Sequence, residues 1–180
     1  YLADTIKDNA PQVIAELKGR GIKTIMISGD QTKTAIAIAE KCGIQEVLAP
    51  VLPGDKAKKI KELQSEGLIV GMVGDGINDA PALKQADIGF AMGLGTDIAI
   101  ETADITLLRN DLKLIPLAID LSQKTFAKIK QNLFWAFFYN LIAIPLAAFG
   151  VLHPVIAEMA MAFSSVTVVT NANLLKRKEN

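Results

Sequence analysis

The sequence predicts an α/β fold, in which helices cover both faces of a partial parallel sheet, followed by an α-helical transmembrane hairpin. Three observations lead to this prediction. Short apolar runs alternate with helical patterns through residues 1–131, and glycine-aspartate turns follow two of these runs. Residues 133–175 are almost devoid of charge. The first two features are typical of parallel sheets covered by helices, and the third is typical of membrane helices.

Each expected element has its own signal. Helices carry apolar residues every three or four positions and often end at glycine, whereas strands are short apolar or β-branched runs. In chain order, we expect helix 11–20, strand 22–27, helix 32–41, strand 46–52, helix 55–66, strand 68–73, helix 78–85, strands 88–91 and 105–108, and a helix from Pro116 that continues into the uncharged region. Both glycine-aspartate turns then lie at carboxyl ends of strands, where such sheets bind ligands.

We expect two membrane crossings, over residues 132–152 and 155–175. Each is long enough to span a hydrocarbon core of about 30 Å at about 1.5 Å per residue. Basic residues flank the pair on one side: Lys124, Lys128, Lys130, Lys176, Arg177 and Lys178. The positive-inside rule therefore predicts that residues 1–131 and 176–180 are cytosolic and that His153 is outside. The alternative is a buried helical hairpin in a soluble protein.

The domain organisation follows from these segments. We expect a globular part over 1–115, a cytosolic stalk helix over 116–131, the two crossings, and a cytosolic tail over 176–180. Because the chain begins at Tyr1 and runs directly into an amphipathic pattern, we also expect it to be a segment of a longer polypeptide.

The amino-acid composition limits which kinds of partner the chain can attract. The chain has 19 lysines and arginines against 19 aspartates and glutamates, so no net field attracts nucleic acid, and membrane lipid is the expected surroundings of the hairpin. The single cysteine, Cys42, has no internal disulfide partner, and we interpret it as a small core residue.

The strongest chemical signal is the stretch GDGINDAPAL over residues 74–83. Asp75 leaves a strand end and Asp79 stands four residues later at a helix start, an arrangement that suits Mg²⁺ together with a phosphoryl group. Gly74 and Gly76 let the backbone approach closely, and we expect Asn78 to cap the helix. The plain alternative is a capped turn with two solvated acids.

This stretch resembles the hinge motif of P-type ATPases, which have the haloacid dehalogenase-like fold. Ser28-Gly29-Asp30 is similar to the family's Thr-Gly-Asp, and Pro53-Gly54-Asp55-Lys56 is similar to its Pro-x-x-Lys. The resemblance implies that Asp75 and Asp79 serve a Mg²⁺ ion. It also implies a catalytic set that holds or neutralises the phosphoryl group: Ser28, Gly29, Asp30, Lys56 and Asn78.

Part of the family's machinery is missing from the sequence. Its nucleophile is the first aspartate of Asp-Lys-Thr-Gly-Thr, and this string does not occur here; nor does the nucleotide-binding domain that follows it. We therefore expect the isolated chain to be inactive. ATP would act through the remainder of the same polypeptide, which is the chain's expected partner.

The uncharged region resembles the last two helices of copper-transporting P-type ATPases. The pattern is Asn132-x6-Tyr139-Asn140-x4-Pro145, followed by Met161-x2-Ser164-Ser165. The resemblance implies that Tyr139, Asn140, Met161 and Ser165 bind Cu⁺, the transported ion, and a thioether is a soft donor that favours Cu(I). The family's Cys-Pro-Cys, which supplies further ligands, lies outside this sequence.

Together these motifs predict part of an ATP-driven pump that exports Cu⁺ from the cytosol, through the cell membrane, by way of an aspartyl phosphate. A copper chaperone would be a further partner of the intact protein. Three alternatives remain open: a pump for zinc, cobalt or divalent copper, a non-catalytic truncated module, and a membrane-anchored phosphatase. The last would need an Asp-x-Asp pair, which the sequence lacks.

Overall fold

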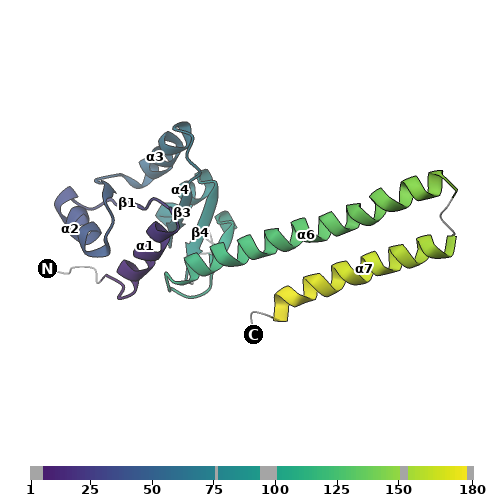
Figure 1. Ribbon diagram of the computed structural model, residues 1–180. Helices are drawn as coiled ribbons and strands as arrows, with labels where there is room; N and C mark the ends of the chain where they lie inside the picture. The colour runs from purple at the N-terminus through teal and green to yellow at the C-terminus, as the bar shows by residue number, and fades with distance from the viewer. Residues whose placement is uncertain (1–5, 76, 94–100, 151–153, 178–180) are drawn as a thin grey trace. The chain divides into compact units, whose positions relative to one another are not determined.

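A computed structural model of the chain describes residues 6–75, 77–93, 101–150 and 154–177 (Figure 1). A few side chains within these ranges, including those of Met161 and Ser164, are outside the description. The chain forms two compact units, Tyr1–Leu117 and Ala118–Asn180.

The first unit alternates strands and helices along the chain, as the sequence predicts. Its helices are α1 (Ala10–Gly19), α2 (Thr32–Cys42), α3 (Pro53–Ser65) and α4 (Ala80–Gln85), with a 3-10 turn, η1 (Ile77–Asp79), directly before α4. Its strands are β1 (Ile25–Ile27), β2 (Glu46–Leu48), β3 (Gly71–Gly74), β4 (Ile88–Met92) and β5 (Ile105–Leu107). The helix α6 also begins in this unit, at Leu114.

The strands form two short sheets, and all of their pairings are parallel. β1 pairs with β2, with Met26 opposite Val47, and the second sheet has the order β3-β4-β5, with Val73 opposite Phe90. The parallel α/β architecture is therefore confirmed. The expectation of one sheet is not met in the described part of the chain, where no strand joins β1 to β3.

Small and branched apolar side chains fill the core of this unit. Val13, Ile60 and Leu83 are its largest fully buried side chains. Close packing is also visible at Gly89 in β4, where an added Cβ would lie 2.8 Å from the carbonyl oxygen of Leu83 in α4. Only glycine leaves room for this helix to lie so close to the strand.

Two local expectations are wrong in detail. The sequence pattern assigned residue 22 to the first strand, but the Ile22 N–H donates to the Leu17 carbonyl at 3.0 Å and so closes α1. β1 accordingly begins only at Ile25. Asn78 does not cap α4, because it lies within η1 and Asp79 takes the cap position, with no side-chain cap bond.

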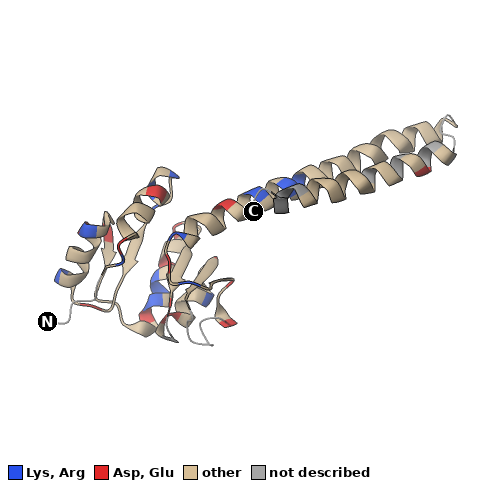
Figure 2. Ribbon diagram, turned by 90° about the horizontal axis from the view of Figure 1, so that it is seen from below, with Lys and Arg blue, Asp and Glu red and all other residues tan. Residues whose placement is uncertain are grey.

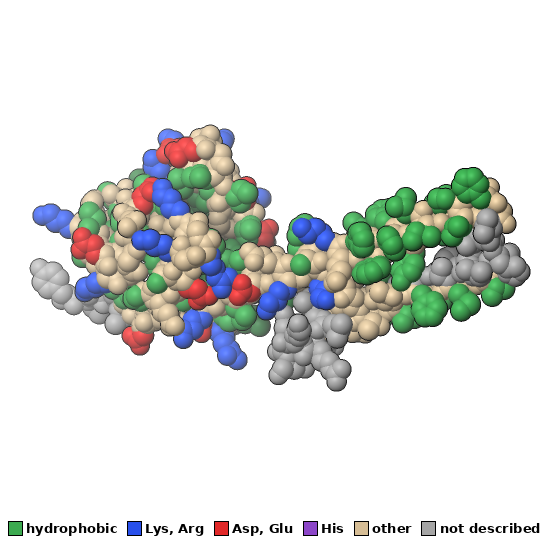
Figure 3. Space-filling model, in the orientation of Figure 1, with side chains coloured by type: hydrophobic (Ala, Val, Ile, Leu, Met, Phe, Trp, Pro, Cys, Tyr) green, Lys and Arg blue, Asp and Glu red, His purple; other side chains and the backbone are tan. Residues whose placement is uncertain are grey.

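The second unit contains two long helices. α6 runs from Leu114 to Ala148 without interruption, although it contains Pro145, and α7 runs from Pro154 to Arg177. Among the described residues, α6 is the one helix long and apolar enough to cross a membrane. Much of the length of both helices carries no charged residues (Figure 2), and hydrophobic side chains gather along them on the face shown in Figure 3. His153, expected outside the membrane, is not among the described residues.

Candidate phosphate site and membrane helices

The first glycine-aspartate turn directly follows β1. The Ser28 hydroxyl donates to Oδ2 of Asp30 at 2.8 Å, and the Asp30 N–H donates to Oγ of Ser28 at 3.1 Å. These two bonds close a tight turn in which the hydroxyl, the carboxylate and the amides are gathered at the carboxyl end of the strand. The Ser28 hydroxyl and the Asp30 amide are both bonded within the turn, so each would have to leave its present acceptor before it could hold an anion.

The loop after β2 holds this turn in place. The Ser28 N–H donates to the Leu48 carbonyl at 3.1 Å, and the Val51 N–H donates to the Ser28 carbonyl at 2.9 Å. The Thr32 hydroxyl donates to the Ala49 carbonyl at 3.0 Å. Because this loop leads directly into α3, the position of the Ser28 turn is tied to the start of that helix.

Lys56 stands in the first turn of α3 and forms an ion pair with Asp79. Lys56 Nζ lies 2.7 Å from Asp79 Oδ1, and the two side chains are only 16% and 14% exposed. Burial of such a pair is costly unless the charges stay together, so the contact fixes α3 against η1. Sequence reasoning gave each residue a role but missed the pairing, since the residues are 23 positions apart and no local pattern reports it.

Gly74 lies directly against the same aspartate. A Cβ at Gly74 would lie 2.6 Å from Cβ of Asp79 and 2.9 Å from its Oδ2. Any larger residue would therefore displace the Asp79 carboxylate. Asp75, the next residue, is exposed, and so is Asn78. Gly76 is outside the described residues.

These residues fit a Mg²⁺ ion that is shared with a phosphoryl group. Mg²⁺ usually takes one or two carboxylates and fills its other positions with water and phosphate oxygens. Asp75 and Asp79 supply that number. No group of three or more His, Cys, Asp or Glu side chains that could hold a metal occurs in the described part of the chain.

The residues predicted from sequence are thus brought together in two clusters. One is Ser28-Gly29-Asp30 with its supporting loop, and the other is Lys56 with Asp79 and Gly74. Asp75 follows Gly74 in the chain and Asn78 precedes Asp79, and both are exposed. No hydrogen bond or ion pair joins the two clusters within the described ranges. α3 connects them, because its preceding loop bonds Ser28 and its first turn bonds Asp79.

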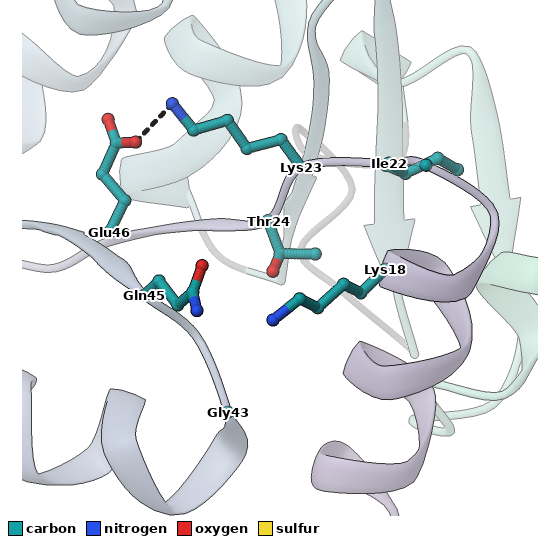
Figure 4. Close-up of a pocket in the computed structure, with 8 residues that line it drawn as sticks. Lys18, Ile22, Lys23, Thr24, Gly43, Gln45 and Glu46 are labelled. Atoms are coloured by element: carbon teal, nitrogen blue, oxygen red, sulfur yellow. Dashed lines mark ion pairs between the residues drawn. The ribbon is translucent and has the colours of Figure 1, made fainter.

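A shallow hollow lies elsewhere in the unit, before the first residues of β1 and β2 (Figure 4). Lys18 and Gln45 point toward its centre, and Lys23 forms an ion pair with Glu46 at its rim. Because β1 and β2 are parallel, their starts lie at the end of the sheet opposite to Ser28. The hollow therefore takes no part in the candidate phosphate site.

The predicted copper ligands lie on both helices of the second unit. Tyr139 is half-buried, and its ring lies 6.1 Å from that of Trp135. Asn140 is exposed, and its amide donates to the Ala136 carbonyl of its own helix at 2.9 Å. Ser165 is exposed, and Met161 lies in α7 with its side chain outside the description. Tyr139 and Asn140 are adjacent on α6, and Met161 and Ser165 are four residues apart on α7.

The parallel α/β fold and the phosphate-site motifs indicate a haloacid dehalogenase-like protein, and comparison with known proteins agrees. The family model for haloacid dehalogenase-like hydrolases matches residues 1–87. A crystal structure of a zinc-transporting PIB-type ATPase is similar over 96% of this chain and 28% of its own, with a TM-score of 0.88 and 40% identity. The catalytic domain of the CPx-ATPase CopB-B covers 64% of the chain at 39% identity, with a TM-score of 0.59.

Curated relatives are more similar still. The copper-exporting P-type ATPase of Staphylococcus haemolyticus is 57% identical over 98% of the chain, and the probable copper-transporting ATPase PacS of Synechocystis is 56% identical over 98%. The chain belongs to the P-type ATPase family. It covers only 22% and 25%, respectively, of the length of these two relatives.

Proposed function

We propose that this chain is the carboxyl-terminal part of a pump that exports Cu⁺ across the cell membrane, driven by ATP through an aspartyl phosphate. The observation that carries the proposal is an identity of 55–57% over 98% of the chain to pumps named for copper export. The zinc-transporting pump of known structure is only 40% identical. Copper is therefore the favoured cargo.

In the proposed pump, the first unit holds the phosphoryl group. Lys56 Nζ, paired at 2.7 Å with Asp79, supplies a positive charge beside the acyl phosphate that the missing nucleophile would carry. Donors of the Ser28 turn hold phosphoryl oxygens, and Asn78 contacts the same group. Asp75 and Asp79 hold Mg²⁺, which when bound neutralises phosphate charge.

The second unit contributes part of the cargo site in this proposal. Tyr139 and Asn140 on α6, with Met161 and Ser165 on α7, bind Cu⁺ together with thiolates from another helix of the polypeptide. The thioether favours Cu⁺ over hard cations because both are soft. Residues 1–131 and 176–180 face the cytosol, where a copper chaperone delivers the ion.

The test uses the full-length polypeptide in lipid vesicles and measures ATP hydrolysis with added Cu⁺ or Zn²⁺. We expect Cu⁺ to stimulate hydrolysis, and Met161→Leu to reduce that stimulation about tenfold or more, since loss of even a residue that supports a metal ligand costs about tenfold to hundredfold. Met159→Leu is the matched control, because Met159 lies on the same helix and is exposed. Stimulation by Zn²⁺ rather than Cu⁺ would show that the cargo is wrong while leaving the pump class intact.

A further inference from the structure

A cluster of four polar side chains joins α6 to α7. Asn171 lies at its centre: its Oδ1 accepts a hydrogen bond from Lys128 Nζ at 2.6 Å, and its Nδ2 donates to Gln131 Oε1 at 3.0 Å and to Asn132 Oδ1 at 2.7 Å. Both N–H bonds of the amide and its oxygen are therefore used. Lys128 also reaches Gln131, at 3.4 Å. None of these residues belongs to the proposed copper ligands.

Three bonds from one side chain to one face of the neighbouring helix fix how far the two helices are shifted along each other. They place Asn132 opposite Asn171. The helices are antiparallel and have the same rise per residue. The residue seven positions after Asn132 therefore lies level with the residue seven positions before Asn171, about 10 Å along the helix axis from the Asn132–Asn171 contact. Those positions are Tyr139 and residue 164, next to Ser165.

The same spacing also fixes the rotation of α6. Seven residues fall about 20° short of two full helical turns, so Tyr139 lies on nearly the same face as Asn132. The half-buried state of Tyr139 agrees with a position facing α7. A shift of one turn between the helices would instead move Tyr139 about 5 Å in depth relative to α7.

We propose that Asn171 is a positioning residue that sets the register of α6 against α7. It does so through its hydrogen bonds to Lys128, Gln131 and Asn132. The register in turn sets the depth at which Tyr139 meets the Ser164-Ser165 stretch. The consequence for Cu⁺ rests on the proposed function. The register does not, because it depends only on contacts between the two helices. Asn132 and Asn171 lie within the two predicted crossings, where hydrogen bonds between polar side chains help helices to associate, and Lys128 and Gln131 lie directly before the first crossing.

The experiment measures register directly, without metal. The experiment uses the 180-residue chain in lipid bilayers, with Cys42→Ser to remove the native thiol. Pairs of cysteines are introduced, one on α6 and one on α7, at positions that the register places at the same depth or about one turn apart. The level pair is Ala136 with Thr167, both half-buried; the offset pairs are Leu133 with Thr167 and Ala136 with Thr170. Diamide drives disulfide formation, and the rates of the three pairs are compared. We expect the level pair to react fastest.

Variants of the cluster then decide the proposal. Asn171→Leu removes all three bonds, and we expect it to reduce the preference for the level pair about tenfold. Asn171→Asp should keep the preference, because its carboxylate accepts from Lys128 and from the reoriented amides of Gln131 and Asn132. Asn173→Leu, at an exposed asparagine two residues further along α7, is the matched control and should behave as the parent.

Asn132→Leu removes a single bond and should reduce the preference for the level cysteine pair by a smaller factor. This variant keeps the proposal testable if circular dichroism shows that Asn171→Leu has lost its helices. If the level pair still reacts fastest by the parent's margin in Asn171→Leu, the proposal is overturned. If Asn171→Leu does not fold, the same result in Asn132→Leu overturns it. So would an equal loss in Asn173→Leu. A pump that prefers Zn²⁺ would overturn only the copper assignment and would leave these crosslinking results unchanged.

Discussion

Lys56 and Asp79 show how much of the candidate site depends on single contacts. Each residue belongs to a motif that is visible in the sequence, and both motifs fall in the predicted elements. The contact between them was not predictable, because it depends on how α3 packs against η1. Two consequences of this geometry can be tested on the chain alone.

Lys56→Met should destabilise the first unit by about 3 kcal/mol, because it leaves the Asp79 carboxylate buried without its cation. Unfolding by urea, followed by circular dichroism, measures the difference. Lys59→Met is the control: Lys59 pairs with Glu62, but those side chains are 38% and 48% exposed, so the loss should stay below about 1 kcal/mol. An equal loss of unfolding free energy in the two variants would mean that burial does not make the Lys56–Asp79 pair more stabilising than an exposed pair.

Gly74→Ala should also destabilise the unit, by about 1–3 kcal/mol, since the new Cβ would lie 2.6 Å from Cβ of Asp79. Gly54→Ala has no atom within 4 Å of the new Cβ and lies in the first turn of α3, so its stability should be unchanged or slightly higher. The same urea titration compares them. A neutral Gly74→Ala would contradict the close approach of β3 to Asp79.

At the scale of elements, the connections between strands rest on short reciprocal hydrogen bonds. The Val70 N–H donates to Oδ2 of Asp87 at 2.8 Å, and the Asp87 N–H donates to the Val70 carbonyl at 2.9 Å. This pair joins the chain entering β3 to the chain entering β4. The hydrogen bond from Val70, assisted by Gln64, lowers the pKa of the Asp87 carboxyl below its ordinary 3.8.

This lowered pKa predicts the pH dependence of one contribution to stability. A carboxyl whose pKa is lower in the folded state stabilises the fold above its unfolded pKa and loses that effect as pH falls through the folded value. We therefore expect Asp87→Asn to be less stable than the parent at pH 7, with a difference that shrinks below about pH 4. Urea midpoints between pH 7 and pH 3 provide the measurement; a constant difference would contradict this origin.

The helix ends were the elements most directly readable from sequence. Gly43 caps α2 with φ at +78°, in the left-handed region that favours glycine, and a glycine directly after a helical pattern is a common helix end. The start of α4 was not readable in the same way. Asn78 and Asp79 are both good cap residues, and the η1 turn, which precedes α4, decides that Asp79 takes the position.

At the scale of the whole molecule, α6 is one helix that contains residues of both compact units. Its continuity was predictable, because no glycine or proline interrupts the pattern between Pro116 and Pro145. The division of the strands into two sheets was not, since strand pairing joins segments that are distant in sequence. For the same reason, the meeting of Lys128 and Asn171 was missed.

A continuous α6 predicts that inserting one alanine between Lys124 and Lys128 in the full-length pump rotates the later residues by about 100° relative to the earlier ones. Copper stimulation of ATP hydrolysis should then be lost, while the same polypeptide with the exposed Gln123 changed to alanine keeps it. An insertion variant that still responds to Cu⁺ would show that α6 does not transmit the phosphorylation state as a rigid rod.

The two short sheets have a practical consequence for handling the chain. Their outer strands have backbone N–H and C=O groups with no strand partner among the described residues. Such borders act as templates on which another molecule can add its own strand. Preparations of the isolated chain should therefore form intermolecular β-structure as concentration rises, and dilution should protect them better than added detergent, which shields the hairpin instead.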